Sequence, residues 1–266
     1  MPYLAWLNFP VPLARIELAP GGEPGGSRRQ RRNSDMAGKP IKQQIPSILR
    51  MILVPALLVG APFAGAGRLD WGRGWIYVAM YMVSGTAILA IGRHYNPSLV
   101  EARKKWLRCD TRRPDRVFLT AFVPLALAQP LIAGLDAERF RWSSMWPGFV
   151  YVGVALFALA TVVVAWTMAV NPFAEPTVRI QKERGHTVIT SGPYRIVRHP
   201  LYAGEILMVV AAPLVLGSVW ALVLSGLMIV LFIARTSWED QTLRRELPGY
   251  EEYAARTRYR LAPGLW

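Results

Sequence analysis

The sequence has few of the residues on which disulfide-bonded and metal-binding proteins depend. It contains one cysteine, Cys109, and three histidines in 266 residues. A single cysteine forms no internal disulfide and no thiolate metal cluster. The histidines, His94, His186 and His199, are too scattered to indicate a metal site, so we predict none. No glycine-rich loop follows a strand-like segment, which argues against a Rossmann-type nucleotide-binding domain.

Acidic residues are also scarce, and the charge balance is strongly basic. Seventeen Asp and Glu face 31 Lys and Arg, which gives a formal net charge of +14. In a nucleic-acid-binding protein these basic residues would be interleaved with a soluble fold. Here they lie between apolar blocks, as in the cytoplasmic loops of membrane proteins. With 53% hydrophobic residues, the chain is predicted to be embedded in a membrane and to have no nucleic-acid partner.

The first 35 residues differ from the rest of the chain. The stretch "APGGEPGGSRRQRRNSD" is rich in Gly, Pro and Arg, a composition typical of disorder. Its charges follow the weakly apolar part and no small-residue cleavage site closes an apolar core, so it does not resemble a secretory signal. We expect residues 1–35 to be a disordered basic tail or a mis-assigned start upstream of Met36.

The remaining chain contains apolar runs long enough to cross a membrane, which needs roughly 20 residues. Residues 36–170 are predicted to form four transmembrane helices, at 47–66, 74–92, 117–135 and 147–170. A last apolar block is too long for one span and carries the Gly-Ser break "LGSVW" at 216–220. We interpret it as a tight helical hairpin, 201–216 and 218–236. The predicted fold is therefore an all-α integral membrane protein with about six transmembrane helices.

The basic residues of the loops alternate as six spans require. Eight Lys and Arg lie between the second and third spans, and only Arg68 and Arg73 lie between the first and second. By the positive-inside rule both termini are cytoplasmic, and in a bacterial source the membrane would be the inner one. Residues 236–258 are charged with spaced aromatics, which predicts a cytoplasmic helix capped by Thr236 and Glu239 and bent at Pro248-Gly249.

The hairpin brings two motifs to one place. Two antiparallel helices of this length return the chain to the face that it left, so "RHPLYAG" (198–204) and "RTSWED" (235–240) are predicted to meet at the cytoplasmic membrane surface. The alternative is structural: arginines as positive flanks, Tyr and Trp as an aromatic belt. An aromatic belt does not need His, Pro and Gly at fixed positions beside Tyr, which favours a functional site.

These motifs resemble a known enzyme family. "IQKERGHTVITSGPYRIVRHPLYAGE", followed by "RTSWEDQTLRRELPGYEEY", is similar to the isoprenylcysteine carboxyl methyltransferases, membrane enzymes that use S-adenosylmethionine and are related to phospholipid methyltransferases. The resemblance covers roughly residues 170–262. It implies that residues 171–266 are a methyltransferase core with a cofactor-binding segment, the helical hairpin and a C-terminal cytoplasmic helix.

The resemblance also implies site residues. Arg235 and Glu239 would be catalytic, and Arg235 would bind a substrate carboxylate. Glu205, an ionisable residue one turn inside a membrane helix, is a second candidate for substrate binding. The residues implied to bind the cofactor are Gln181, His186, Thr187, Val188, Ile189, Tyr194, His199, Pro200, Leu201, Tyr202 and Glu239.

Three functions stay open at this point. The first is an S-adenosylmethionine-dependent carboxyl O-methyltransferase whose partner is a membrane lipid, or a lipidated small molecule or protein, such as an isoprenylcysteine. A carboxylate needs no general base, and Arg235 could orient it. The second is a phospholipid or other amine N-methyltransferase, for which Glu239 or Glu205 is a candidate base. The third is a non-catalytic membrane protein of the same fold.

Overall fold

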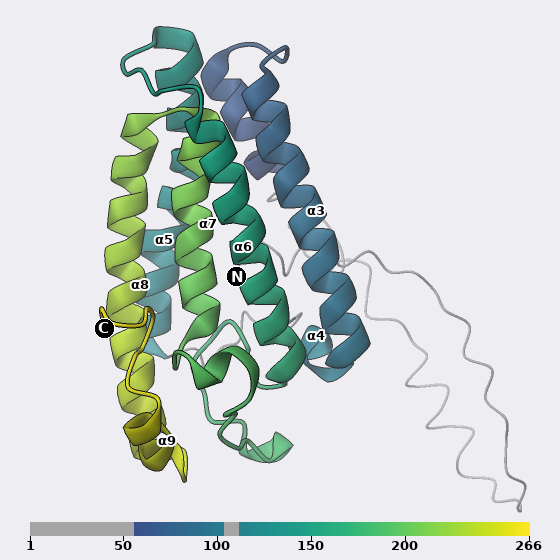
Figure 1. Ribbon diagram of the computed structural model, residues 1–266, viewed down its shortest axis with the longest axis vertical. Coiled ribbons are helices and arrows are strands. Elements are labelled where there is room, and N and C mark those ends of the chain that lie inside the picture. Colours follow the sequence, from purple (N-terminus) through teal and green to yellow (C-terminus); the bar gives the residue numbers. More distant parts are fainter. Residues whose placement is uncertain (1–55, 104–111) are drawn as a thin grey trace, which may run out of the picture.

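The computed structural model describes residues 56–103 and 112–266, and within these ranges it is all-helical, with no strand (Figure 1). Four helices are long and apolar enough to cross a membrane: Gly72–Tyr95, Arg113–Phe140, Phe149–Val170 and Val219–Glu246. Two further apolar helices, Ala56–Ala66 and Pro200–Leu216, are shorter than a typical span. The prediction of an all-helical fold with several apolar helices of membrane-spanning length is confirmed for the described residues, and the six spans stay a prediction.

Most predicted spans coincide with observed helices. The elements are α3 (Gly72–Tyr95), α4 (Pro97–Arg103), α5 (Arg113–Gly134), the π-helical turn η2 (Leu135–Phe140), α6 (Phe149–Val170), the 3₁₀ turns η3 (Lys182–Arg184) and η4 (Gly192–Arg195), α7 (Pro200–Leu216), α8 (Val219–Glu246) and α9 (Tyr250–Arg256). The tail at 1–35, Cys109 and the first part of the span predicted at 47–66 lie outside the described residues.

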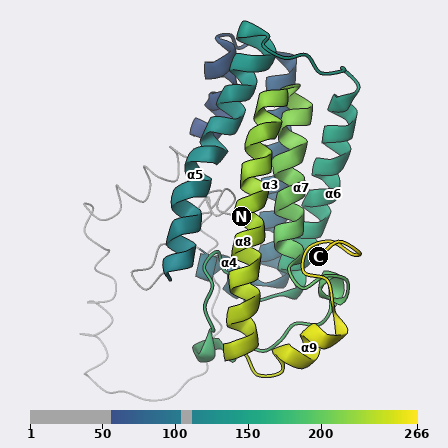
Figure 2. The ribbon, with the colours of Figure 1, turned by 90° about the vertical axis from the view of Figure 1, so that its left-hand side faces the viewer.

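The predicted hairpin is observed as α7 and α8, which lie side by side (Figures 1 and 2). Helix α7 ends at Leu216 and is capped by Gly217, whose φ of 81° is readily adopted only by glycine. Ser218 then caps α8, its hydroxyl accepting a hydrogen bond from the Ala221 amide at 3.0 Å. A two-residue turn therefore reverses the chain, as the Gly-Ser break predicts.

One predicted boundary is wrong. Helix α8 continues to Glu246 without a break at residue 236, so no separate cytoplasmic helix begins there and no capping box forms. The Thr236 hydroxyl donates instead to the Phe232 carbonyl at 2.7 Å, inside the continuous helix. The predicted bend at Pro248-Gly249 is present: Gly249 has a φ of 80° and α9 follows it.

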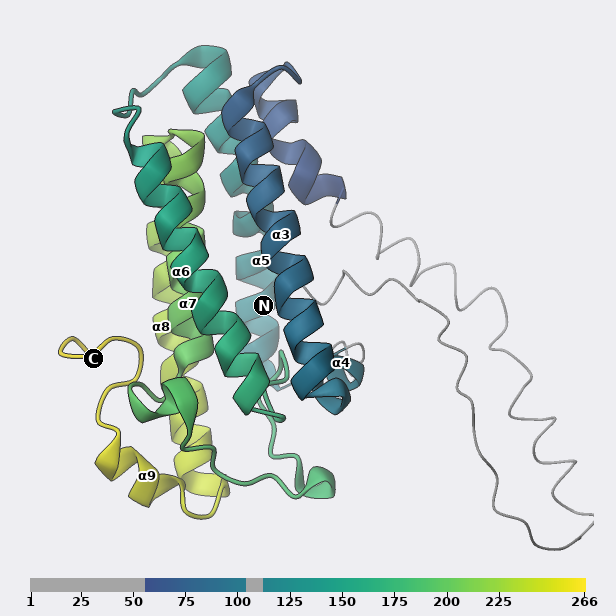
Figure 3. The same ribbon diagram turned by 45° about the vertical axis from the view of Figure 1, so that its right-hand side comes forward.

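Small residues let α6 and α7 pack closely (Figure 3). A Cβ built on Gly153 of α6 would lie 2.9 Å from the Ala211 carbonyl oxygen, and one on Gly204 of α7 would lie 2.7 Å from a methyl group of Val164. Ala160 and Ala211 are fully buried in the same interface. This packing fixes the position of α7, whose first turn carries the "HPLY" motif.

The polar segments gather at one end of the bundle. Helix α4, residues 171–199 and α9 all lie at the lower end in Figure 1. Asn96, in the turn before α4, donates 2.7 Å hydrogen bonds to the Met168 and Ala169 carbonyls at the end of α6. These bonds satisfy carbonyls that a helix end leaves without partners. The segment that follows α6 therefore starts from a fixed point beside the first turn of α7.

Candidate functional site

A cavity opens at this end of the bundle, between residues 171–199, the start of α7, α8 and α9. It has about 750 Å³ of empty space, part of it open to solvent. Nearly all of the predicted cofactor residues line it: His186, Thr187, Val188, Ile189, Tyr194, His199, Leu201, Tyr202 and Glu239. Gln181 and Pro200 do not. The structure therefore brings residues from both predicted motifs, and from the predicted cofactor-binding residues 186–189 that precede them, to one cavity.

Tyr202 joins the two motifs of the hairpin. Its hydroxyl donates a hydrogen bond to the Glu239 carboxylate and accepts one from Nε of Arg235 at 2.8 Å. The two helices thus meet at the end where the chain enters and leaves the hairpin, as their lengths predict. The three side chains form one continuous polar chain, in which Tyr202 and Glu239 line the cavity and Arg235 lies behind Tyr202.

Arg235 has a partner that the sequence did not suggest. Its Nη2 lies 3.0 Å from Oδ1 of Asp115 in α5 and donates to the Pro176 carbonyl at 2.5 Å. Its guanidinium also lies over the ring of Phe118, 4.4 Å from the centroid. Nη1 is buried and has no hydrogen-bond partner among the described residues. A buried guanidinium with one open N–H can hold an oxygen of a bound molecule.

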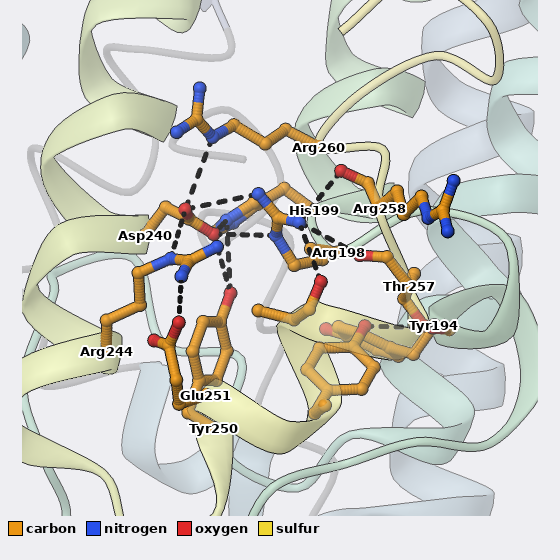
Figure 4. A network of polar contacts seen from close by, with 12 residues as sticks. Tyr194, Arg198, His199, Asp240, Arg244, Tyr250, Glu251, Thr257, Arg258 and Arg260 are labelled. Carbon is orange, nitrogen blue, oxygen red and sulfur yellow. Dashed lines mark hydrogen bonds and ion pairs between the residues drawn. The ribbon is translucent and has the colours of Figure 1, made fainter.

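Asp240, the acid next to Glu239, faces a different set of partners (Figure 4). It is fully buried. Arg198 donates to both of its oxygens, at 2.8 and 3.2 Å, and the Tyr250 hydroxyl donates at 3.0 Å. Nε2 of His199 lies 3.3 Å away. Asp240 therefore fixes the orientation of His199 and ties α9 to the hairpin.

Arg198 extends this network to the end of the chain. Its Nη1 donates to the carbonyls of Thr257 and Arg258 at 2.9 and 2.8 Å, and its backbone amide donates to the Tyr259 carbonyl at 2.9 Å. Arg260 contacts Asp240 at 3.2 Å. The C-terminal segment is thus held against the start of α7, on one side of the cavity.

Aromatic rings form much of the cavity wall. The rings of His199 and Tyr202 are stacked, with centroids 5.9 Å apart and planes inclined by 5°. Tyr194 accepts a 2.5 Å hydrogen bond from Asn171 at its hydroxyl, and burial raises the pKa of Tyr194 above its ordinary value. The phenol is therefore neutral at physiological pH. Such a wall can hold a cation against ring faces.

Gln181 supports the cavity rather than lining it. Its side chain is buried and donates to the Phe173 carbonyl at 2.7 Å, and its backbone amide donates to Nδ1 of His186 at 3.3 Å. Burial lowers the pKa of His186, which keeps that imidazole neutral, as an acceptor at Nδ1 requires. The His186 ring packs on Phe173, with centroids 4.4 Å apart.

Glu205 is not among the residues that line the cavity. It is 5% exposed on the buried face of α7, and its charge acts on the buried Arg103 at the end of α4. Arg103 in turn donates to the Ala174 carbonyl. The role of Glu205 in substrate binding stays a prediction.

Sequence reasoning missed Asp115 and the roles of Arg198 and Asp240. An acid in the first turn of a helix is usually explained by the helix dipole, and an arginine beside a membrane by the positive-inside rule. Both explanations are local, whereas the partners of these residues lie far away in the chain. Among the described residues, no group of three or more His, Cys, Asp and Glu could hold a metal ion.

Comparisons with known proteins agree with this geometry. Residues 149–248 match the family model for phospholipid methyltransferase. The cobalt-zinc-cadmium resistance protein CzcN of Cupriavidus metallidurans is 30% identical over 132 residues, which are 48% of this chain and 56% of that protein. The chain thus spans about half the length of this curated relative. The match includes α6, α7, α8 and most of the cavity wall. Residues 149–248 are therefore similar to the phospholipid methyltransferase family, to which the isoprenylcysteine carboxyl methyltransferases are related.

Proposed function

We propose that the protein is a membrane methyltransferase that binds S-adenosylmethionine in this cavity and methylates a lipid-borne acceptor. The observation that carries the proposal is that residues 186–189, Tyr202 and Glu239, which are distant in the sequence, line one cavity. The match of residues 149–248 to the phospholipid methyltransferase model supports it independently.

The residues of the cavity fit this cofactor, which supplies an activated methyl group on a sulfonium cation. The stacked rings of His199 and Tyr202 and the phenol of Tyr194 present faces that attract a cation. Glu239 presents a carboxylate that can accept hydrogen bonds from amino or ribose groups. Asp240 holds His199 in position. Because methyl transfer is a direct displacement, these residues would act mainly by positioning and electrostatics.

The acceptor can be a carboxylate or an amine. Carboxyl O-methylation of an isoprenylcysteine-like lipid is the hypothesis that Arg235 supports, since a guanidinium binds a carboxylate. N-methylation of a phospholipid or another amine is supported by the description of the matched family. Either acceptor would reach the site from the membrane, in which the apolar parts of α5 and α8 are proposed to lie.

We also propose the orientation and the full number of spans. The cavity and the polar segments would face the cytoplasm, where the basic loops are favoured. Helix α7 is 17 residues long, about 25 Å at 1.5 Å per residue, and runs beside α6 and α8. It would cross most of the bilayer as part of the hairpin, and the helix that includes Ala56–Ala66 would be the first of six spans.

Calorimetric binding of S-adenosylhomocysteine, the demethylated cofactor, to the detergent-purified protein tests this proposal. The wild type is expected to bind in the micromolar range. Glu239→Ala should weaken binding at least about tenfold, because a partly buried acceptor of hydrogen bonds in the cavity wall is lost. Glu252→Ala is the matched control, since Glu252 is exposed on α9, and should bind like the wild type. A folded wild type that does not bind would favour a non-catalytic protein of the same fold.

A further inference from the structure

A second, smaller cavity lies between α5 and α8, beside the first. It has about 270 Å³ of empty space, and its lining includes Asp115, Val178, Arg235, Trp238, Glu239 and Thr242. Val178 and Glu239 line both cavities. Trp238 is 42% exposed at its outer side. The smaller cavity, which we name the side cavity, is thus a neighbour of the proposed cofactor site and is placed to hold the group that receives the methyl.

Asp115 balances the charge of Arg235 in this cavity. Both side chains are almost completely buried, and they form an ion pair at 3.0 Å. The second oxygen of Asp115 accepts the Val178 amide at 2.8 Å. Asp115 therefore connects α5 with α8 and with the segment around Val178, which precedes the cavity-lining residues 186–189. The charge of Arg235, which would attract an acceptor carboxylate, already has a partner in the protein.

The formal charges of the site favour an acceptor that is not an anion. The lining of the side cavity has two acids, Asp115 and Glu239, and two bases, Arg112 and Arg235. Because Arg112 is paired with Glu246, Asp115, Glu239 and Arg235 together carry one net negative charge. Arg112 forms a bidentate ion pair with Glu246, in which its Nη1 and Nη2 donate to the two carboxylate oxygens at 2.9 and 2.7 Å. S-adenosylmethionine carries one net positive charge, which makes the loaded site neutral. In the loaded site the neutral form of an amine, which is the form that reacts, adds no charge. A carboxylate would add an unbalanced buried charge, which is costly.

This inference rests on the proposed function and deepens it. We propose that Asp115 determines acceptor specificity: by neutralising Arg235 it adapts the side cavity to an acceptor whose reacting group is an amine, in preference to a carboxylate. Arg235 then acts as a hydrogen-bond donor, through its open Nη1, to an oxygen near the amine. This role differs from the carboxylate binding that the resemblance to the isoprenylcysteine carboxyl methyltransferases implies for Arg235.

The chemistry of an amine acceptor is consistent with this arrangement. With S-adenosylmethionine bound, the lone pair of a neutral amine would form the new N–C bond while the S–C bond of the cofactor would break and leave its electron pair on sulfur. The positive charge passes to nitrogen, which then releases a proton. Glu239, which lines both cavities, is the carboxylate that takes this proton. A carboxylate acceptor would release no proton and would leave Glu239 without this task.

Charge preference can be measured by binding, without a known acceptor. Octylamine and octanoate share an apolar chain and differ in the charge of the head group. Their affinities are measured by calorimetry on the full chain in nanodiscs of zwitterionic lipid, with S-adenosylhomocysteine present. S-adenosylhomocysteine carries no net charge, so Asp115, Glu239 and Arg235 keep one net negative charge, and the wild type should prefer the protonated octylamine. In Asp115→Asn the ratio of the two affinities should shift at least about tenfold toward octanoate, because Arg235 is released from its partner. Asp70→Asn, at an exposed acid in another part of the chain, should leave the ratio unchanged.

Two further variants separate charge from folding. Asp115→Glu keeps the charge and should keep the wild-type preference. The double variant Asp115→Asn with Arg235→Gln removes both charges, leaves no unpaired buried guanidinium, and should also prefer octylamine. A wild type that prefers octanoate, an Asp115→Asn ratio equal to the wild type, or a double variant that prefers octanoate would each overturn the inference. A wild type that does not bind S-adenosylhomocysteine would overturn the proposed function and this inference with it.

Discussion

Glu239 and Asp240 are neighbours in the chain with different surroundings. Successive residues of a helix point about 100° apart, given 3.6 residues per turn. Glu239 accordingly lines the cavity and accepts the Tyr202 hydroxyl, while Asp240 faces Arg198 and the end of the chain. The sequence motif shows only an acidic pair. The structure separates a residue proposed to bind ligand from one that holds the site together.

Replacing Asp240 is expected to destabilise the protein strongly. Asp240→Ala leaves Arg198 buried without its carboxylate, and removing one partner of a buried ion pair costs about 3–5 kcal/mol. The free energy of unfolding in detergent should fall by about this amount. Asp70→Ala removes the partner of Arg68 in an exposed pair, whose side chains are 49% and 71% accessible, and should have little effect. Equal stability of Asp240→Ala and Asp70→Ala would contradict the structural role given to Asp240.

At the scale of single residues, the sequence predicted the members of the cavity better than their partners. His199, Tyr202, Arg235 and Glu239 come together because a hairpin of known length returns the chain to its starting face. Asp115 reaches Arg235 through the packing of α5 against α8. The order of helices around a bundle is not encoded in spacing along the chain, so no local pattern could reveal this pair.

At the scale of elements, local signals predicted turns well and one helix end poorly. Gly217 and Ser218 end α7 and start α8 by backbone conformation and capping, which are local properties. The apolar run predicts a helix that ends at residue 236, whereas α8 ends at Glu246. The helix continues because Glu, Gln, Leu and Arg are good helix formers, and because Asp240 packs against Arg198 and Tyr250. Polarity marks where a segment leaves the membrane, not where a helix ends.

The close contact of α6 and α7 gives a test at this scale. In Gly153→Ala the new methyl group would lie 2.9 Å from the Ala211 carbonyl oxygen and from the Val215 amide nitrogen. Backbone atoms cannot rotate away, so the helices must separate, which costs about 1–3 kcal/mol. The fall in the free energy of unfolding should be accompanied by weaker S-adenosylhomocysteine binding, since α7 carries His199 at its start.

Gly226→Ala is the matched control. A Cβ at Gly226 of α8 meets nothing within 4 Å, and alanine in place of glycine inside a helix stabilises it by about 0.5–1 kcal/mol. The two substitutions are chemically identical and should change the free energy of unfolding in opposite directions. If Gly153→Ala were as stable as Gly226→Ala, α6 and α7 would lie farther apart than the structure has them.

At the scale of the whole molecule, charge is distributed unequally between the two ends. Among the described residues, the end with the cavity carries the basic groups of the α5 start and of residues 179–198, including Arg112, Arg179 and Arg184. The opposite end has Arg68 bound to Asp70 and Glu138. There the buried Asp136 accepts hydrogen bonds from Ser143 and Ser218 at 2.7 and 2.6 Å. This asymmetry favours a cytoplasmic position for the cavity end.

Cysteine labelling tests that orientation. The substitution Cys109→Ser removes the only cysteine of the sequence. In this background, single cysteines can be placed at exposed residues at opposite ends of the bundle: Ser144→Cys in the loop before α6 and Glu252→Cys on α9. A membrane-impermeant maleimide should label Ser144→Cys on intact cells and Glu252→Cys only after permeabilisation. Labelling of both positions from the same side would refute the transmembrane arrangement. Labelling of Glu252→Cys on intact cells and of Ser144→Cys only after permeabilisation would place the cavity outside the cytoplasm, where S-adenosylmethionine is not made. The proposed function therefore depends on the orientation, and this experiment tests both.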